Sequence, residues 1–146
     1  MPGLKYWPDL SGYSTSKLRS LGEECQRKGA AEVHLLYTEL DKLTQEQVAA
    51  LAFPGVTDVR FSTELLENLP EFTLGKLSKI FPDLEVLEIE RANLSLPQIV
   101  LLGIQFPDLR KLILSTDSET YTANQLKTFS RSFRHLEHLR IDGFGI

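Results

Sequence analysis

A short apolar pattern recurs along this chain at nearly constant spacing, and it limits the folds that the chain can adopt. Each copy has a phenylalanine, followed by apolar residues three, six and eight positions later. The copies read FPGVTDVRF from Phe53, FPDLEVLEI from Phe81, FPDLRKLIL from Phe106 and FRHLEHLRI from Phe133, with a fainter copy at Ala30, Val33 and Leu35. The first apolar positions, 30, 56, 84, 109 and 136, are separated by 26, 28, 25 and 27 residues. This period predicts structural repeats that stack on one another.

The second half of each repeat predicts a helix. Thr44, Ser95 and Thr122 are each followed three residues later by Gln, which is the capping-box pattern of a helix start, and Asn68-Leu69-Pro70-Glu71 is a close variant. Apolar pairs that flank the three hydroxyl caps predict hydrophobic staples: Leu43 with Val48, Leu94 with Ile99, and Tyr121 with Leu126. Each helix should run to the Phe that opens the next copy. Ser16, at the equivalent offset before Ala30, predicts a first helix over residues 16–28.

One strand and one helix in each repeat predict an α/β fold with a parallel sheet, because a strand that returns through a helix runs parallel to the one before it. We expect five strands, paired in chain order, with the helices on the opposite side. They should lie near residues 31–36, 57–62, 85–90, 110–115 and 137–142. Residues 1–28 would form an N-terminal cap and first helix, and residues 29–146 one continuous repeat domain.

The LxxLxL strings at 25–28-residue periods resemble leucine-rich repeats with a helical convex side. They are similar to the ribonuclease-inhibitor type and to the irregular repeats that follow the F-box in ubiquitin-ligase substrate receptors, for which FPDLEVLEI is typical wording. The resemblance covers about residues 29–146. It implies a short solenoid that acts as a non-enzymatic adaptor or receptor fragment. One departure is that the family's Asn or Cys, eight residues after the first Leu, is replaced by Thr38, Glu64, Ala92, Asp117 and Phe144, so a regular horseshoe curvature is not expected.

The composition narrows the classes of partner. The formal net charge of −4 argues against a nucleic-acid partner, because binding to phosphates needs a basic surface. Cys25 is the only cysteine, which fits an intracellular location, cytoplasmic or nuclear. We expect no membrane span, because the chain has no run of about 18 apolar residues.

Reactive side chains are not expected to meet. His34 and His138 would lie on strands at least three spacings of about 4.8 Å apart, too far to share a metal ion or a proton. His135 is interpreted as a solvated loop residue and Cys25 as a structural thiol. We therefore expect no catalytic site, no metal and no cofactor. Two alternatives to the adaptor stay open: a structural subunit buried in a larger assembly and, less favoured, a small α/β enzyme.

The outward positions of the predicted strands form columns across the sheet. The columns read Glu32, Asp58, Val86, Lys111, His138; then His34, Arg60, Glu88, Ile113, Arg140; then Leu36, Ser62, Glu90, Ser115, Asp142. Arg60 would pair with Glu88, and Val86 with Ile113 would form a small apolar patch. Apolar residues rimmed by charges suit recognition of a protein. The candidate partner-binding residues of this concave face are Asp58, Arg60, Val86, Glu88, Glu90, Lys111, Ile113, His138 and Arg140.

A second candidate surface is the edge of the last predicted strand. After Ile141 the chain reads Asp142-Gly143-Phe144-Gly145-Ile146, with no helix to cover that strand. An open strand edge invites pairing with another chain. We therefore expect the edge beside Phe144 and Ile146 to be completed by further repeats of a longer protein, or by a partner, including a second copy of this chain.

Overall fold

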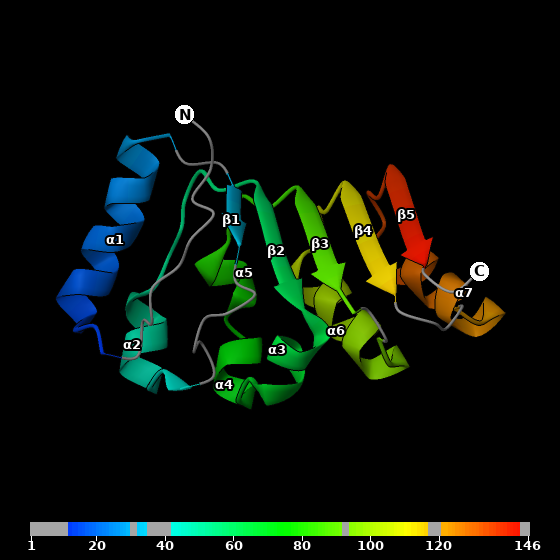
Figure 1. Cartoon of the computed structure of the whole chain (residues 1–146), viewed down its shortest axis with the longest axis horizontal. Coiled ribbons are helices and arrows are strands. Elements are labelled where there is room, and N and C mark those ends of the chain that lie inside the picture. Colours follow the sequence, from blue (N-terminus) through cyan, green and yellow to red (C-terminus); the bar gives the residue numbers. More distant parts are fainter. Residues whose placement is uncertain (1–11, 30–31, 35–41, 92–93, 117–120, 144–146) are drawn as a thin grey trace.

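The structure is a computed structural model, and it describes residues 12–29, 32–34, 42–91, 94–116 and 121–143. These residues form an α/β fold around one sheet with the order β1-β2-β3-β4-β5, in which all neighbouring strands are parallel. In Figure 1, α5, α6 and α7 lie behind the sheet, whereas α1 and α2 lie beyond its β1 edge. The α/β class and the parallel pairing in chain order agree with the prediction from sequence.

Four strands of full length make up the body of the sheet. They are β2 (Asp58–Ser62), β3 (Val86–Glu90), β4 (Lys111–Thr116) and β5 (His138–Gly143). The first strand, β1 (Glu32–His34), has only three residues and pairs with β2. The strand expected over residues 31–36 is therefore described over half that length, and Leu36 lies outside the described residues.

The strand register confirms the columns derived from the repeat. Arg60 pairs with Glu88, Glu88 with Ile113, and Ile113 with Arg140. The neighbouring column runs from Glu32 through Asp58, Val86 and Lys111 to His138. Constant register follows from the repeat, because each strand places the same two apolar positions against the helices.

Capping residues start the longer helices as the sequence predicts, with one exception. The helices α2 (Gln45–Ala50), α6 (Leu96–Gln105) and α7 (Ala123–Ser132) begin after Thr44, Ser95 and Thr122, and each has a complete capping box. The exception is α1 (Thr15–Arg27), which agrees with the helix predicted over residues 16–28 but starts before Ser16. The N-cap is Ser14, whose Oγ accepts a hydrogen bond from the backbone N–H of Lys17 at 3.2 Å.

Hydrogen bonds also join one repeat to the next. The Gln47 side chain closes its capping box and donates through Nε2 to the carbonyl oxygen of Tyr13 at 2.9 Å. Gln125 closes its own box and donates in the same way to the carbonyl oxygen of Leu94 at 3.0 Å. Of the pair predicted as the third staple, Tyr121 packs its ring edge-on to Phe129, and Leu126 is 42% exposed.

The helix expected between Asn68 and Phe81 is divided into two short ones, and a third short helix ends at Asn68. These are α3 (Thr63–Asn68), α4 (Glu71–Leu74) and α5 (Leu77–Ile80). Ser62, at the end of β2, accepts a hydrogen bond from the N–H of Leu65 and starts a helix at once. Pro70 then prevents α3 from continuing, because proline lacks an N–H and disfavours a helical residue before it. Asn68 is therefore the last residue of a helix, and α4 starts after Pro70 without a side-chain cap.

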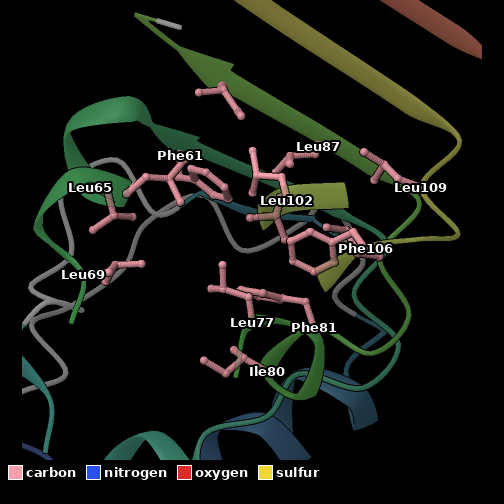
Figure 2. Packing of buried hydrophobic residues seen from close by; sticks show 14 of the residues in the cluster. Phe61, Leu65, Leu69, Leu77, Ile80, Phe81, Leu87, Leu102, Phe106 and Leu109 are labelled. Carbon is pink, nitrogen blue, oxygen red and sulfur yellow. The ribbon is translucent and has the colours of Figure 1, made fainter. Parts of the chain in front are cut away.

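The core lies between the sheet and the helices behind it. Figure 2 shows Phe61 and Leu87 from the strands facing Leu102 of α6, with Leu77 and Phe81 beneath them. Phe53 and Phe81, which open successive repeats, stack with ring centroids 5.5 Å apart. These buried contacts between repeats hold the sheet and leave its other face outside the core.

The inward apolar side chains of the last strand, β5, are less buried than those of β4. Leu112 and Leu114 of β4 are fully buried, whereas Leu139 and Ile141 at the matching positions of β5 are 39% and 38% exposed. Within the described residues, β5 pairs with β4 alone. The inward side chains of β5 are therefore covered from one side only, as expected of a terminal repeat.

Candidate functional site

The face of the sheet that points away from the helices carries the predicted site residues. In β2 and β3 buried residues alternate with half-buried ones. The half-buried residues include Asp58, Arg60, Val86 and Glu88. Alternation of this kind places successive side chains on opposite faces of the sheet, so these four share the face away from the core.

A shallow depression of about 150 Å³ lies on this face. Its lining includes Asp58, Arg60, Val86, Glu88, Lys111 and Ile113, all predicted from the sequence, together with Glu32 and Val59. The depression is smaller than the roughly 300–1,000 Å³ of typical small-molecule sites. It has room for one side chain of a partner at the centre of a wider contact.

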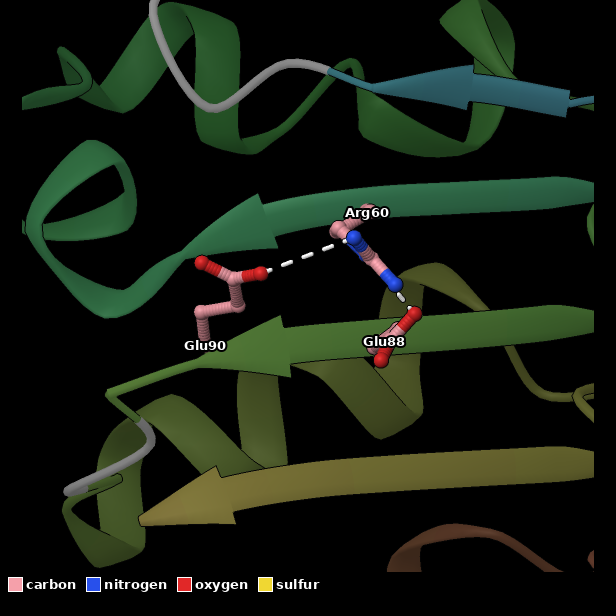
Figure 3. Close-up of polar contacts among 3 residues, drawn as sticks. All are labelled: Arg60, Glu88 and Glu90. Carbon is pink, nitrogen blue, oxygen red and sulfur yellow. Dashed lines mark hydrogen bonds and ion pairs between the residues drawn. The ribbon is translucent and has the colours of Figure 1, made fainter. Parts of the chain in front are cut away.

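Arg60 is held in place by two carboxylates of the neighbouring strand. Its Nε lies 2.8 Å from Oε2 of Glu88, and its Nη1 lies 3.6 Å from Oε1 of Glu90 (Figure 3). The hydrogen bond to Glu88 raises the pKa of Arg60, and the charges of Glu88, Glu90 and Glu32 act in the same direction against the effect of burial. The guanidinium is therefore charged and oriented before any partner arrives.

The charges on this face are separated along the sheet. Over β1 to β3, Glu32, Asp58, Glu88 and Glu90 outnumber the single cation Arg60. Over β4 and β5, the same three columns hold the cations Lys111 and Arg140, and the column of Glu90 continues through Ser115 to Asp142. Val86 and Ile113 lie on adjacent strands at the boundary, and both line the depression. An apolar centre therefore separates an acidic half from a basic half.

Three predicted residues of this face lie outside the depression. Glu90 contributes through its ion pair with Arg60. His138 and Arg140 are exposed on β5, at the end of their columns. Phe144 and Ile146, predicted for the C-terminal edge, lie outside the described residues. Glu32 was missed as a site residue because the first repeat is the faintest in sequence.

The reactive side chains stay apart, as far as the structure describes them. Cys25 is 4% exposed, and burial raises the pKa of its thiol. His135 lies in the loop after α7, with Nε2 3.9 Å from Oδ1 of Asp108 and both side chains largely exposed. No group of three His, Cys, Asp or Glu residues suited to a metal ion occurs among the described residues. In the same part of the chain, no helix has the length and apolar character that crossing a membrane requires.

The helix side holds a second hollow that the sequence analysis missed. A groove of about 480 Å³ lies between the C-terminal ends of α6 and α7. The signal was present in the sequence, because Leu96, Val100 and Ile104 recur every four residues on a helix whose other face is also apolar. The repeat accounts only for the buried face of α6.

Comparison with known proteins gave no match. The sequence matches no protein-family model and no curated protein, and the structure matches no solved structure.

Proposed function

We propose that this chain is a short leucine-rich-repeat solenoid that binds a protein partner through the sheet face around Arg60. In this proposal it works as a non-enzymatic adaptor, or as part of a substrate receptor of the ubiquitin-ligase type. Its place would be the cytoplasm or nucleus, in line with the single cysteine. The observation that carries the proposal is a sheet face outside the core of the described residues, on which a prearranged ion pair and an apolar centre line one depression.

The solenoid is supported by the repetition of the same unit in sequence and in space. Parallel strands pair in chain order at constant register, and each returns through helical structure to the next. Phe53 and Phe81, at equivalent positions of two successive repeats, stack on one another. Such units cannot bury their own apolar faces, so they are stable only in arrays.

Binding to a protein is supported by the chemistry of the face. Half-buried Val86 and Ile113 offer apolar contact, while the charges on either side fix the orientation of a partner. Because Arg60 is already held by Glu88 and Glu90, little side-chain freedom remains to be lost on binding. The fitting partner carries basic groups over β2 and β3, an apolar side chain at the centre, and acidic groups over β4 and β5.

The test is capture of partners from lysate by the wild-type chain and by three variants, with identification by mass spectrometry. Each of the variants Ile113→Asp, Lys111→Glu and Arg60→Glu should bind the captured protein with an affinity that is lower by roughly thirtyfold. This loss is equivalent to about 2 kcal/mol, as expected for a central contact. The variants should remain folded, because these side chains point away from the core. Arg19→Glu, an exposed charge reversal on α1, is the matched control and should bind normally. Equal binding by all three variants would move the site off this face.

A second candidate function, that of a structural subunit, is supported by the open end of the sheet. Leu139 and Ile141 occupy positions that are fully buried in the preceding strand, yet they are 39% and 38% exposed. Another repeat, or a second copy of the chain, would cover them. In this case the β5 end, and not the sheet face, is the obligatory contact.

A further inference from the structure

The helix α6 is apolar on the side that faces away from the core. Leu96, Val100 and Ile104 are four residues apart and are 43%, 43% and 68% exposed, while Ile99, Leu102 and Gly103 are buried. Residues at this spacing lie above one another on a helix. A helix that is apolar on both faces is normally covered on both. From Leu96 to Ile104 the outer stripe extends about 12 Å along the helix axis.

The groove lies beside the C-terminal half of this stripe. Val100, Gly103 and Ile104 line it from α6, and Arg131, Ser132 and Arg134 line it from the end of α7 and the loop that follows. Gly103 allows the close approach at the floor, because a Cβ at this position would lie 2.5 Å from Cβ of Ser132. The two helix ends therefore form a concave channel with an apolar wall.

The polar rim of the groove is lined by basic residues and, in the described part of the chain, by no carboxylate. Arg131 and Arg134 are exposed and make no ion pair among the described residues, and His135 joins them at the rim. His135 has an acidic neighbour, Asp108, whose Oδ1 lies 3.9 Å from Nε2. This basic rim contrasts with the net charge of −4 of the whole chain. A partner that places carboxylates at the rim gains two ion pairs without displacing existing ones.

We propose that the groove between α6 and α7 is a second protein-docking surface, and that it binds an acidic amphipathic helix. The apolar side chains of that helix would lie over Val100 and Ile104, and its carboxylates would pair with Arg131 and Arg134. An elongated occupant fits better than a compact one, because the apolar stripe extends beyond the groove to Leu96. A peptide helix also fits better than a lipid surface, because a flat membrane cannot enter a concave channel. This surface is independent of the sheet face.

The probe is a displayed library of helical peptides of about 15 residues, or roughly four turns, selected for binding to the full chain. We expect the enriched peptides to combine Asp or Glu with apolar residues three and four positions apart. Their affinity should fall by about tenfold or more for Ile104→Glu and for Arg131→Glu. Chemical-shift changes in the wild-type chain should centre on Gly103 and Ser132, which locates the site without any substitution.

Two variants control for the substitutions themselves. Leu126→Glu adds a carboxylate at an exposed apolar residue of α7 that does not line the groove, and Arg19→Glu reverses an exposed charge on α1. Both should bind the selected peptides as the wild type does. The proposal is overturned if no enriched peptide depends on Ile104, or if the enriched peptides are rich in Lys and Arg. It is also overturned if vesicles of anionic lipid bind the wild-type chain and not Ile104→Glu, since the stripe would then be a membrane contact.

Discussion

Gly103 sets the distance between α6 and α7. A methyl group at this position would lie 2.5 Å from Cβ and 2.7 Å from the carbonyl oxygen of Ser132. Both distances are shorter than van der Waals contact, and neither atom moves when the side chain of Ser132 changes its rotamer. A side chain here therefore has to separate the two helices.

We predict that Gly103→Ala lowers the free energy of unfolding by about 1–3 kcal/mol, the usual cost of overpacking. Urea denaturation followed by circular dichroism measures the change. Gly12→Ala is the control, because nothing lies within 4 Å of a Cβ at that position, and it should cause no loss of stability. An unchanged midpoint for Gly103→Ala would mean that α7 moves aside freely, and that the floor of the groove is not rigid.

Helix starts show how local hydrogen bonds define the elements of this fold. At α2, α6 and α7 a hydroxyl and a glutamine satisfy each other's backbone groups. At α1 two serines compete for the same role. Ser14 accepts a hydrogen bond from the N–H of Lys17, whereas Ser16 is an exposed residue inside the first turn.

We predict that Ser14→Ala destabilises α1 by about 1 kcal/mol, the typical value of an N-cap. Ser16→Ala should leave stability within about 0.5 kcal/mol, as for other surface positions. Amide hydrogen exchange in α1 is the suitable measurement, because the effect can be confined to local opening of this helix. A larger loss for Ser16→Ala than for Ser14→Ala would place the helix start two residues later.

The whole molecule is asymmetric along its repeat axis. Its β1 end adjoins α1, which packs beside α2 with Leu18 and Cys25 buried (Figure 1). At the other end, Leu139, Ile141 and Leu126 are each exposed by 38% or more. Stacked repeats need a cover on their outermost unit, and in the described residues only the first end has a helix in that place.

We therefore predict that the chain associates through its β5 end as its concentration rises. Ile141→Lys should weaken this association by about tenfold, because it places a charge on the contact surface, and sedimentation velocity measures the change. Ile104→Lys alters a more exposed apolar residue on α6 and should leave the association unchanged. A chain that stays monomeric at every concentration, with or without Ile141→Lys, would rule out self-association at this end.

The features that could be predicted from the sequence arise from residues close together in the chain. The apolar positions recur every 25 to 28 residues, so each strand faces the core in the same way, and the columns of Arg60, Glu88 and Ile113 follow. Capping boxes join residues three positions apart, so they are visible as short motifs. The ion pair of Arg60 with Glu88 could also be predicted from the sequence, because a constant register makes the two residues neighbours.

The contacts and gaps between repeats were determined only by the tertiary structure. The second repeat divides its helical segment at Pro70, because Ser62 starts a helix directly after β2. The α6–α7 groove depends on Gly103 meeting Ser132, which are 29 positions apart in sequence. The exposure of Leu139 and Ile141 depends on what covers β5, although their pattern equals that of Leu112 and Leu114. A periodic sequence determines how each unit faces its neighbours, but the contacts and gaps between units depend on side-chain volumes that meet only after folding.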